Sequence, residues 1–277
     1  MSKFRKLEKM STWRTLAIHT WGKPSDPTVY GTMEIDVGKA LPWLERARER
    51  SGAKITFTHL VGKAAAVAIR ERPELNGIIR GGKIFLRDTV DVFFQVAFDG
   101  GEDLSGVKVS RCDEKSVLEI AKDLAEKAER IRQKTDETLQ STTQMLNRVP
   151  PRLVGLALRA AAALSYDFDL DLRRFGIPYD QFGSIMVTNV GGFGVQHGYA
   201  PLLPFSRTPA LLLIGAVMDK VVARDGQPTI APILTVGATF DHRFIDGFQA
   251  AKLSKRFQDI VTDPERHLGS ADGARVA

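Results

Sequence analysis

The sequence predicts a single α/β domain, and three observations support that prediction. Segments with strand and helix periodicity alternate along the first third of the chain, and strands return in the last third. Hydrophobic residues make up 43% of the 277 residues, which is enough to fill a core and excludes a mainly disordered chain. The chain has no internal repeat and no linker that divides it, so residues 1–277 are expected to fold as one unit.

The first third is expected to begin with one strand and two helices. Residues 28–37 alternate apolar and polar side chains in the manner of a half-buried strand. Residues 39–50 suit a short amphipathic helix that ends near Gly52. Residues 56–70 carry apolar side chains near helical spacing and predict a buried helix, which Pro73 closes.

A hairpin, a strand and a long helix are expected next. The hairpin turns at Gly81-Gly82, and residues 90–98 form the strongest strand of this half. Residues 113–134 predict the clearest helix, because apolar residues recur every three or four positions and face the core. Ser116 and Glu119 resemble a capping box at its start.

The middle of the chain contains an apolar helix, Leu153–Leu164, after the helix-breaking pair Pro150-Pro151. This helix is shorter than the roughly 20 apolar residues that cross a bilayer, so no membrane span is expected. Its side chains are either buried within their own subunit or form a contact site, because a contiguous apolar patch in water usually marks one.

The last third is expected to hold strands and a final helix. The strands are predicted at residues 184–190, 210–217, 221–223 and 233–240. Asp225-Gly226 has the composition of a hairpin turn. The final helix is expected over Gly247–Val261, and residues 269–277 are expected to be a disordered tail.

Charge and cysteine content bear on the class of protein. The net charge of +6 invites a nucleic-acid partner, but the basic residues are dispersed among acidic ones, so none is expected. The five histidines show no metal-ligand spacing, so no bound metal is expected. Cys112 has no intrachain partner for a disulfide and no secretory signal is visible, so a cytoplasmic location is expected.

His242 is the strongest candidate for a chemical role. It lies between a predicted strand and a predicted helix, where a side chain can reach a cleft. An imidazole is the side chain best suited to take a proton near neutral pH. Structural roles are the alternative, with His242 a loop histidine whose hydrogen bonds are satisfied and Asp246 the N-cap of the following helix.

The motif around His242 resembles that of a known family. His-x-x-x-Asp-Gly, at His242–Gly247, is similar to the signature of the dihydrolipoamide acyltransferase catalytic domain of 2-oxoacid dehydrogenase complexes, a relative of chloramphenicol acetyltransferase. Three more segments resemble the family in the same order: Glu34–Val37, Pro73–Asn76 and Val187–Gly194. The resemblance covers most of residues 11–265 and implies a chloramphenicol acetyltransferase-like two-layer sandwich of a mixed β-sheet and helices.

The resemblance also implies a reaction. An acyl group would pass between a thioester and an acceptor thiol or hydroxyl, with coenzyme A or acyl-CoA as a substrate and no acyl-enzyme. His242 would be the general base. Thr188 lies where the family has a hydroxyl that donates to the tetrahedral oxyanion, a donor worth about 3 kcal/mol, although it could equally be an ordinary β-branched strand residue. Asp246 would hold the loop by pairing with Arg14.

Assembly and partners follow from the same resemblance. It implies a homotrimer with the active site between subunits, so that His242 of one subunit faces Thr188 of the next, and a larger cage in some members. The chain starts at the core, so no lipoyl group is expected on it, and an external lipoyl or acyl carrier could be the donor. Residues 135–180 are expected to be a divergent insertion. The expected lack of a lipoyl group and the expected insertion differ from the family pattern. They keep a second function open, that of a non-catalytic assembly protein with the acyltransferase fold.

Overall fold

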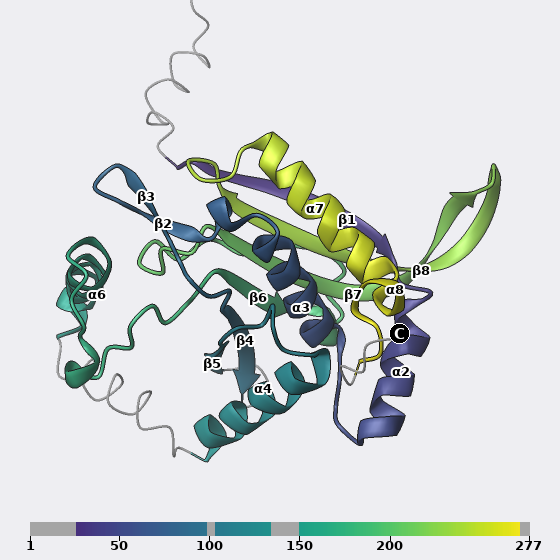
Figure 1. Cartoon of the computed structure of the whole chain (residues 1–277), viewed down its shortest axis with the longest axis horizontal. Coiled ribbons are helices and arrows are strands. Elements are labelled where there is room, and N and C mark those ends of the chain that lie inside the picture. The colour runs from purple at the N-terminus through teal and green to yellow at the C-terminus, as the bar shows by residue number, and fades with distance from the viewer. Residues whose placement is uncertain (1–25, 99–102, 134–149, 272–277) are drawn as a thin grey trace, which may run out of the picture.

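The computed structural model describes residues 26–98, 103–133 and 150–271. Within them, a six-stranded sheet has the order β1-β8-β7-β6-β4-β5 (Figure 1). Its strands are β1 Thr28–Asp36, β4 Val92–Phe98, β5 Asp103–Val109, β6 Ile185–Asn189, β7 Ala210–Arg224 and β8 Gln227–Asp241. The strand pairs β4–β6 and β6–β7 are parallel and the other neighbours are antiparallel, so the sheet is mixed.

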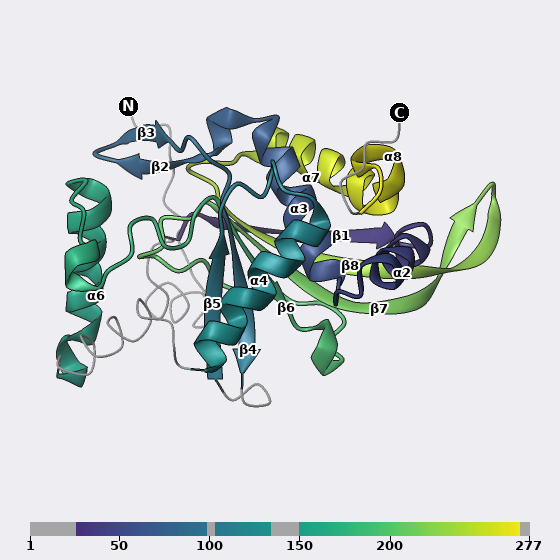
Figure 2. The same ribbon diagram turned by 60° about the horizontal axis from the view of Figure 1, so that its bottom comes forward.

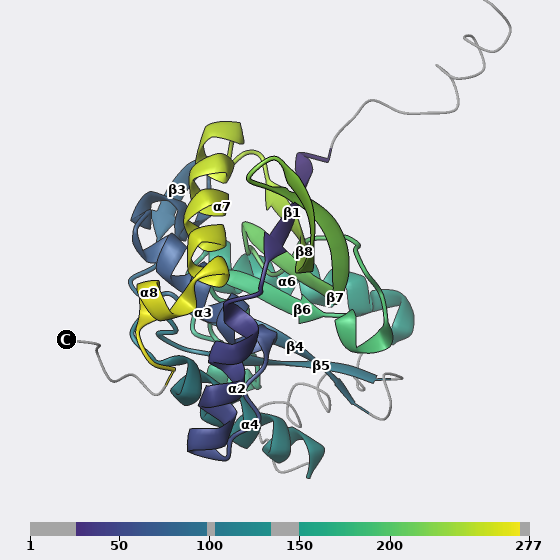
Figure 3. The same cartoon turned by 90° about the vertical axis from the view of Figure 1, so that its right-hand side faces the viewer.

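Helices form the second layer and cover one face of the sheet (Figure 3). They are α2 Ala40–Ser51, α3 Phe57–Arg70, α4 Val117–Arg132, α7 Gly247–Thr262 and α8 Pro264–Leu268. The main core lies between the two layers, where Leu60 of α3 and Ile260 of α7 are fully buried with Phe94 and Leu234 of the sheet. The predicted two-layer arrangement of helices on a mixed sheet is confirmed.

Side-chain caps fix where two of these helices begin. The Ser116 hydroxyl accepts from the Glu119 backbone N–H, and a Glu119 carboxylate oxygen accepts from the Ser116 N–H at 2.7 Å, which confirms the predicted capping box of α4. No capping box is predicted at α3. There the ring Nδ1 of His59 accepts from the Thr56 backbone N–H at 2.9 Å, so a buried imidazole takes the place of the usual Glu or Gln.

Two strands differ from the prediction. The expected break between residues 217 and 221 is wrong, because β7 runs unbroken to Arg224 and pairs with β8 as far as Gln227. The outer half of this hairpin projects beyond the body, where both of its faces meet water and the apolar alternation is lost (Figure 1). Its turn at Asp225-Gly226 is where the sequence predicted it, with both residues at positive φ. Strand β5 was not expected.

A two-stranded hairpin and a short helix lie to one side of the sheet (Figure 2). The hairpin joins β2 Gly77–Arg80 to β3 Lys83–Leu86. The helix α6 spans Val154–Ala162, shorter than the predicted Leu153–Leu164, and continues as one π-helical turn, Ala163–Asp167. The helices in the described ranges are each too short or too polar to span a bilayer.

The first residues of the predicted tail contact the core. The Trp43 indole N–H donates to the Gly269 carbonyl at 2.9 Å, and the Leu118 backbone N–H donates to the Ala271 carbonyl. Ala271 is buried, so residues 269–271 are ordered parts of the domain. Residues 272–277 lie outside the described residues.

Candidate active site

The loop that carries His242 is held on both sides. Strand β8 ends at Asp241, whose carboxylate accepts from the Arg243 backbone N–H at 3.0 Å and from the Arg243 guanidinium at 2.6 Å. This pairing raises the pKa of Arg243. The next two residues, Phe244 and Ile245, are buried and anchor the loop in the core. Asp241 and Arg243 are not among the predicted site residues, although their spacing of two residues in a tight turn is the available signal.

His242 itself is exposed. Its backbone N–H donates to the Pro27 carbonyl at 2.9 Å, which ties the loop to the segment before β1. Because the backbone is fixed and the ring is open to solvent, the imidazole can reach a molecule bound at this end of the sheet.

Asp246 caps the helix that follows. Its carboxylate accepts from the Gln249 backbone N–H at 3.0 Å, and the Gln249 side-chain oxygen accepts from the Asp246 N–H at 2.9 Å. This is a capping box, so the structural role considered for Asp246 is present. Arg14, the expected partner of Asp246, lies outside the described residues.

Thr188 occupies the end of β6, on the sheet face away from the helices. Along this strand Val187 faces the main core, while Met186 belongs to a second apolar cluster on the opposite face. Strand alternation places Thr188 on the same face as Met186. Thr188 is half-buried, so its hydroxyl is accessible beside the end of the strand.

The turn after Thr188 is fixed by its neighbours. The Asn189 side-chain amide donates to the Thr58 hydroxyl of α3 at 2.9 Å, and its oxygen accepts from the Gly191 N–H. A Cβ on Gly191 would lie 2.5 Å from the Gly215 carbonyl oxygen, so only glycine permits this close approach. Asn189 therefore positions the turn, although it is not among the predicted site residues.

A segment without regular structure, residues 194–204, then crosses the outer face of the sheet. The Ala216 N–H donates to the Val195 carbonyl at 2.8 Å, and the Thr239 hydroxyl donates to the Ala200 carbonyl at 2.8 Å. A Cβ on Gly237 would lie 2.0 Å from the Gly198 carbonyl oxygen, so the segment lies directly on β8. This crossing segment runs from the Thr188 end of the sheet toward the His242 end.

Within one chain Thr188 and His242 are far apart. Thr188 is aligned with Leu213 of β7, and Leu213 is aligned with Gly237 of β8. His242 follows Gly237 by five residues, which is roughly 16 Å along a strand at about 3.3 Å per residue. A general base and an oxyanion donor that serve one reaction must both lie within hydrogen-bond reach of the reacting group. One chain therefore does not bring these two side chains to one site.

A cleft of about 320 Å³ opens beside the His242 loop. Asp241 and Arg243 line it together with Pro27 and Tyr30 of the N-terminal strand region. The end of the crossing segment, residues 201–204, and the hairpin residues 77–79 form its other walls. The cleft thus has both polar and apolar walls and could take part of an organic substrate.

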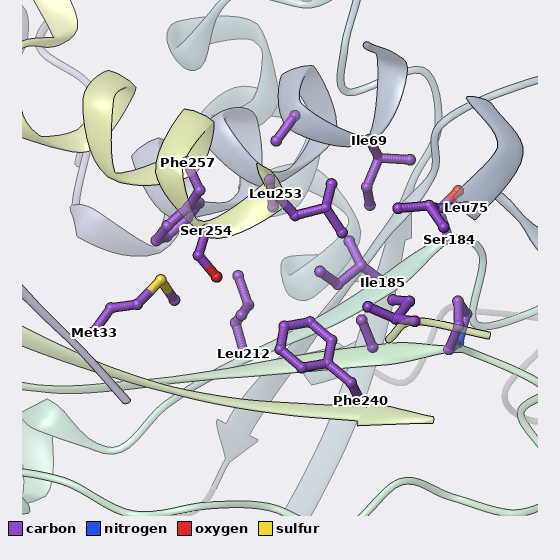
Figure 4. A pocket seen from close by; sticks show the side chains of 15 residues that line it. Met33, Ile69, Leu75, Ser184, Ile185, Leu212, Phe240, Leu253, Ser254 and Phe257 are labelled. Atoms are coloured by element: carbon purple, nitrogen blue, oxygen red, sulfur yellow. The ribbon is translucent and has the colours of Figure 1, made fainter. Parts of the chain in front are cut away.

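A second cavity lies inside the fold, between α3, α7 and the sheet (Figure 4). Its walls are apolar, including Met33, Leu212 and Phe257, with the Ser184 and Ser254 side chains also on its lining. Its volume of about 30 Å³ is too small for a substrate. We therefore place the candidate active site at the His242 cleft.

Comparison with known proteins shows the family to which this chain belongs. The family model described as "2-oxoacid dehydrogenases acyltransferase (catalytic domain)" matches residues 17–144 and 180–269, well over half of the chain. The dihydrolipoyllysine-residue acetyltransferase component of the acetoin cleaving system of Bacillus subtilis is 28% identical over 238 residues, covering 84% of this chain and 49% of the relative. The mitochondrial dihydrolipoyllysine-residue succinyltransferase of Saccharomyces cerevisiae is 26% identical over 220 residues, covering 79% of this chain and 38% of the relative. The chain thus spans about half or less of the length of these two relatives.

Solved structures share the fold. A probable dihydrolipoamide acetyltransferase from Listeria monocytogenes superposes with a TM-score of 0.64 at 18% identity, covering 94% of each chain. The cubic core of a pyruvate dehydrogenase multienzyme complex gives a TM-score of 0.64 at 20% identity, covering 96% of this chain and 95% of the other. The Azotobacter vinelandii dihydrolipoamide acetyltransferase gives a TM-score of 0.64 at 19% identity, covering 94% of this chain and 93% of the other.

The family match contains all the candidate residues that the structure describes, and the structural likeness extends over nearly the whole chain. The chain belongs to the family of 2-oxoacid dehydrogenase acyltransferase catalytic domains.

Proposed function

We propose that this protein transfers an acyl group between the thioester of coenzyme A and an acceptor thiol, or a hydroxyl, with His242 as general base. The observation that carries the proposal is the exposed imidazole on a loop fixed by Asp241, Arg243 and Pro27, beside a cleft of about 320 Å³. Membership in an acyltransferase family adds the reaction class.

The proposed reaction needs few groups from the chain. The His242 imidazole takes the proton from the acceptor thiol, and the thiolate attacks the thioester carbonyl. The Thr188 hydroxyl donates a hydrogen bond to the oxygen that becomes negative in the tetrahedral intermediate. The intermediate collapses, the carbon–sulfur bond to coenzyme A breaks, and the leaving thiolate takes the proton back from the imidazolium.

A covalent acyl-cysteine has no support in the structure. Cys112 is buried, and this burial raises the pKa of its thiol to about 12. A thiol with that pKa remains protonated near neutral pH and is a poor nucleophile. No group of three or more His, Cys, Asp or Glu residues that could hold a metal occurs in the described part of the chain, and the proposed steps use none.

The proposed active unit is a homotrimer with sites between subunits. The separation of Thr188 and His242 within one chain supports it, since a neighbouring copy must bring its Thr188 hydroxyl to the His242 cleft. A ring of identical head-to-tail contacts supplies one complete site at each interface. A cubic core is the form of one structural neighbour, and a larger cage remains a proposal for this chain.

The named relatives support the roles and leave the acyl group open. In the Azotobacter enzyme a serine, a histidine and an asparagine are named in the catalytic mechanism, the asparagine four positions after the histidine. His242 and Asp246 have that spacing here. One relative is named for an acetyl group and another for a succinyl group, both on a dihydrolipoyllysine residue. An external lipoyl carrier is therefore the proposed acyl donor or acceptor. The proposal also includes an ion pair between Asp246 and Arg14 that holds the His242 loop.

A non-catalytic assembly role is the second candidate. The observation that favours it is the interruption of the family match, which leaves residues 145–179 unmatched. Titration calorimetry with coenzyme A separates the two functions. Heat of binding at one site per chain supports the enzyme, and absence of binding supports the assembly protein.

The direct test is an exchange assay with acetyl-CoA and dihydrolipoamide. We expect the wild type to release coenzyme A and His242→Ala to lose about 10²- to 10⁴-fold in rate, the usual contribution of a general base. His267→Ala is the matched control, because this half-buried histidine lies at α8, near Arg256. Equal rates for wild type and His242→Ala would refute the assignment.

A further inference from the structure

The segment that the family match omits forms its own surface at one edge of the molecule. Helix α6 stands apart from the sheet in two views (Figures 1 and 2). Its contact with the body is a small cluster in which Ala162 and Tyr166 pack against Ile78 of β2 and Phe205. Because this cluster buries only one side of α6, the opposite side faces solvent.

Ion pairs fix the segment in this position. Asp167 pairs with Arg207 at 2.8 Å, and Asp169 pairs with Arg80 at 3.1 Å. The Arg80 guanidinium also lies 4.8 Å from the centre of the Phe85 ring. Through Arg80, the α6 segment and the β2–β3 hairpin form one continuous surface, which we call the apolar rim.

The apolar rim exposes an unusual number of large apolar side chains. Its exposed members are Leu153, Leu156, Leu164, Phe168, Leu170, Phe175 and Tyr179 of the α6 segment, and Ile84, Phe85 and Leu86 of the hairpin. Phe168 and Phe175 are about 70% exposed, and Leu156 is 65% exposed. These ten are more than half of the exposed large apolar residues in the described part of the chain. An exposed apolar patch of this size usually marks a site of interaction with another protein or with a membrane.

The charges of the apolar rim are positive. Asp167 and Asp169 are neutralised by the arginines named above, and Asp171 pairs with Arg173 at 2.5 Å. Four exposed cations are left, namely Arg152, Arg159, Arg174 and Lys83, and none of them has a carboxylate within ion-pair distance in the ranges that the structure describes. Unpaired cations thus alternate with Leu153, Leu156 and Ile84 along the rim.

We propose that the apolar rim docks on the surface of an anionic lipid bilayer. Exposed leucines and phenylalanines that enter the headgroup region, together with arginines that meet lipid phosphates, are the features of a helix that lies in the interface. Helix α6 has nine residues and is about 14 Å long, so it cannot cross a hydrocarbon core of about 30 Å.

Charge favours a bilayer over a second copy of the chain. The protein carries a net charge of +6, so a second copy has no net negative charge to complement the unpaired cations of the rim. An anionic leaflet supplies that complement over a wide, deformable surface. This docking does not depend on the proposed acyl transfer. If both hold, the acyl transfer takes place at a membrane surface.

Vesicle sedimentation tests the docking directly. The full chain is spun with vesicles of phosphatidylcholine alone and with vesicles that also contain phosphatidylglycerol. We expect the protein to sediment with the anionic vesicles and to be released by high salt. The double variant Leu156→Asp/Phe168→Asp should lower the partition coefficient at least tenfold. Arg152→Gln and Arg159→Gln should each lower it about fivefold.

The matched control places the same change on another exposed apolar pair. Val221 and Ile230 face each other on the projecting β7–β8 hairpin and are 73% and 71% exposed, so Val221→Asp/Ile230→Asp should leave vesicle binding unchanged. Equal loss in both double variants, or no sedimentation of the wild type with anionic vesicles, would overturn the proposal. The rim would instead be assigned to contact with a second copy under two conditions. The wild type does not sediment with vesicles, and a rim variant changes the oligomeric state in the absence of lipid. Acyl-transfer rates without vesicles should be the same in the rim variants, which keeps this test separate from that of the proposed function.

Discussion

Thr188 lies in β6 and His242 lies in the loop directly after β8, and the two are separated by two strand positions and by about five residues along the direction of β8. The crossing segment, residues 194–204, covers the sheet face between them. This arrangement fits a reaction site completed by a second subunit and does not fit one formed within a single chain.

The Thr188 hydroxyl should matter through its hydrogen bond. Thr188→Val keeps the β-branched shape on β6 and removes the donor, so kcat should fall about a hundredfold, in line with a donor worth about 3 kcal/mol. Thr188→Ser keeps the donor and should retain most of the activity. The exchange assay measures both. Comparable rates for the valine variant and the wild type would show that Thr188 is only a strand residue.

Asp246 has a demonstrated capping role and a proposed charge role, which two variants separate. Asp246→Ala removes the acceptor for the Gln249 N–H and should cost about 1 kcal/mol in the free energy of unfolding. Asp246→Asn still caps the helix but loses the negative charge. If pairing with Arg14 orders the His242 loop, the asparagine variant keeps its stability and loses activity. An asparagine variant with both properties unchanged would leave capping as the whole role of Asp246.

His59 should make stability depend on pH. Burial lowers its pKa from 6.5 to about 4 in the folded state, so the folded protein holds the ring neutral while the unfolded chain takes up a proton below pH 6.5. The stabilisation is therefore complete above pH 6.5 and is lost progressively as the pH falls toward 4, by up to about 3 kcal/mol.

Denaturant unfolding at several pH values measures this effect. His59→Gln offers an oxygen that can accept from the Thr56 N–H and does not titrate, so its stability curve should be flatter between pH 6.5 and 4. The wild type and the variant should differ in the slope of the free energy of unfolding against pH, whatever their stability at pH 8. Parallel curves would show that His59 is not the group responsible.

Gly237 should be intolerant of a side chain because the crossing segment lies on it. A Cβ there would lie 2.0 Å from the Gly198 carbonyl oxygen, so Gly237→Ala should push the segment away and cost about 1–3 kcal/mol. Gly31 on the adjacent strand β1 has no atom within 4 Å of an added Cβ, so Gly31→Ala is the matched control. Thermal unfolding compares them, and equal melting temperatures would contradict the close approach.

Features set by local chemistry could be predicted from the sequence. The Ser116–Glu119 capping box and the Asp225-Gly226 turn depend on neighbouring residues, and both are found where expected. Strand β5 was missed because Gly106 interrupts its pattern. That glycine is explained only by the partner strand, since a Cβ there would lie 1.9 Å from the ring of Phe93.

Features set by strand order could not be predicted. The sequence placed Thr188 and His242 on motifs of one family, but the distance between them depends on β7 lying between β6 and β8 and on the alignment of all three strands. Likewise, the apolar pattern of α6 was compatible with burial or contact, and only its position beyond the sheet edge showed the exposure of Leu156 and Phe168.

The central claim is that each active site takes His242 from one subunit and Thr188 from another. Subunits carrying His242→Ala and subunits carrying Thr188→Ala, with different affinity tags, are to be mixed, allowed to exchange, and purified through both tags. Sites shared around a ring predict that two inactive proteins recover activity. The expected rate is about one third of the wild-type rate, because each mixed trimer that carries both tags has one intact site out of three. Mixed assemblies that contain both subunits and remain as inactive as either parent would contradict the claim.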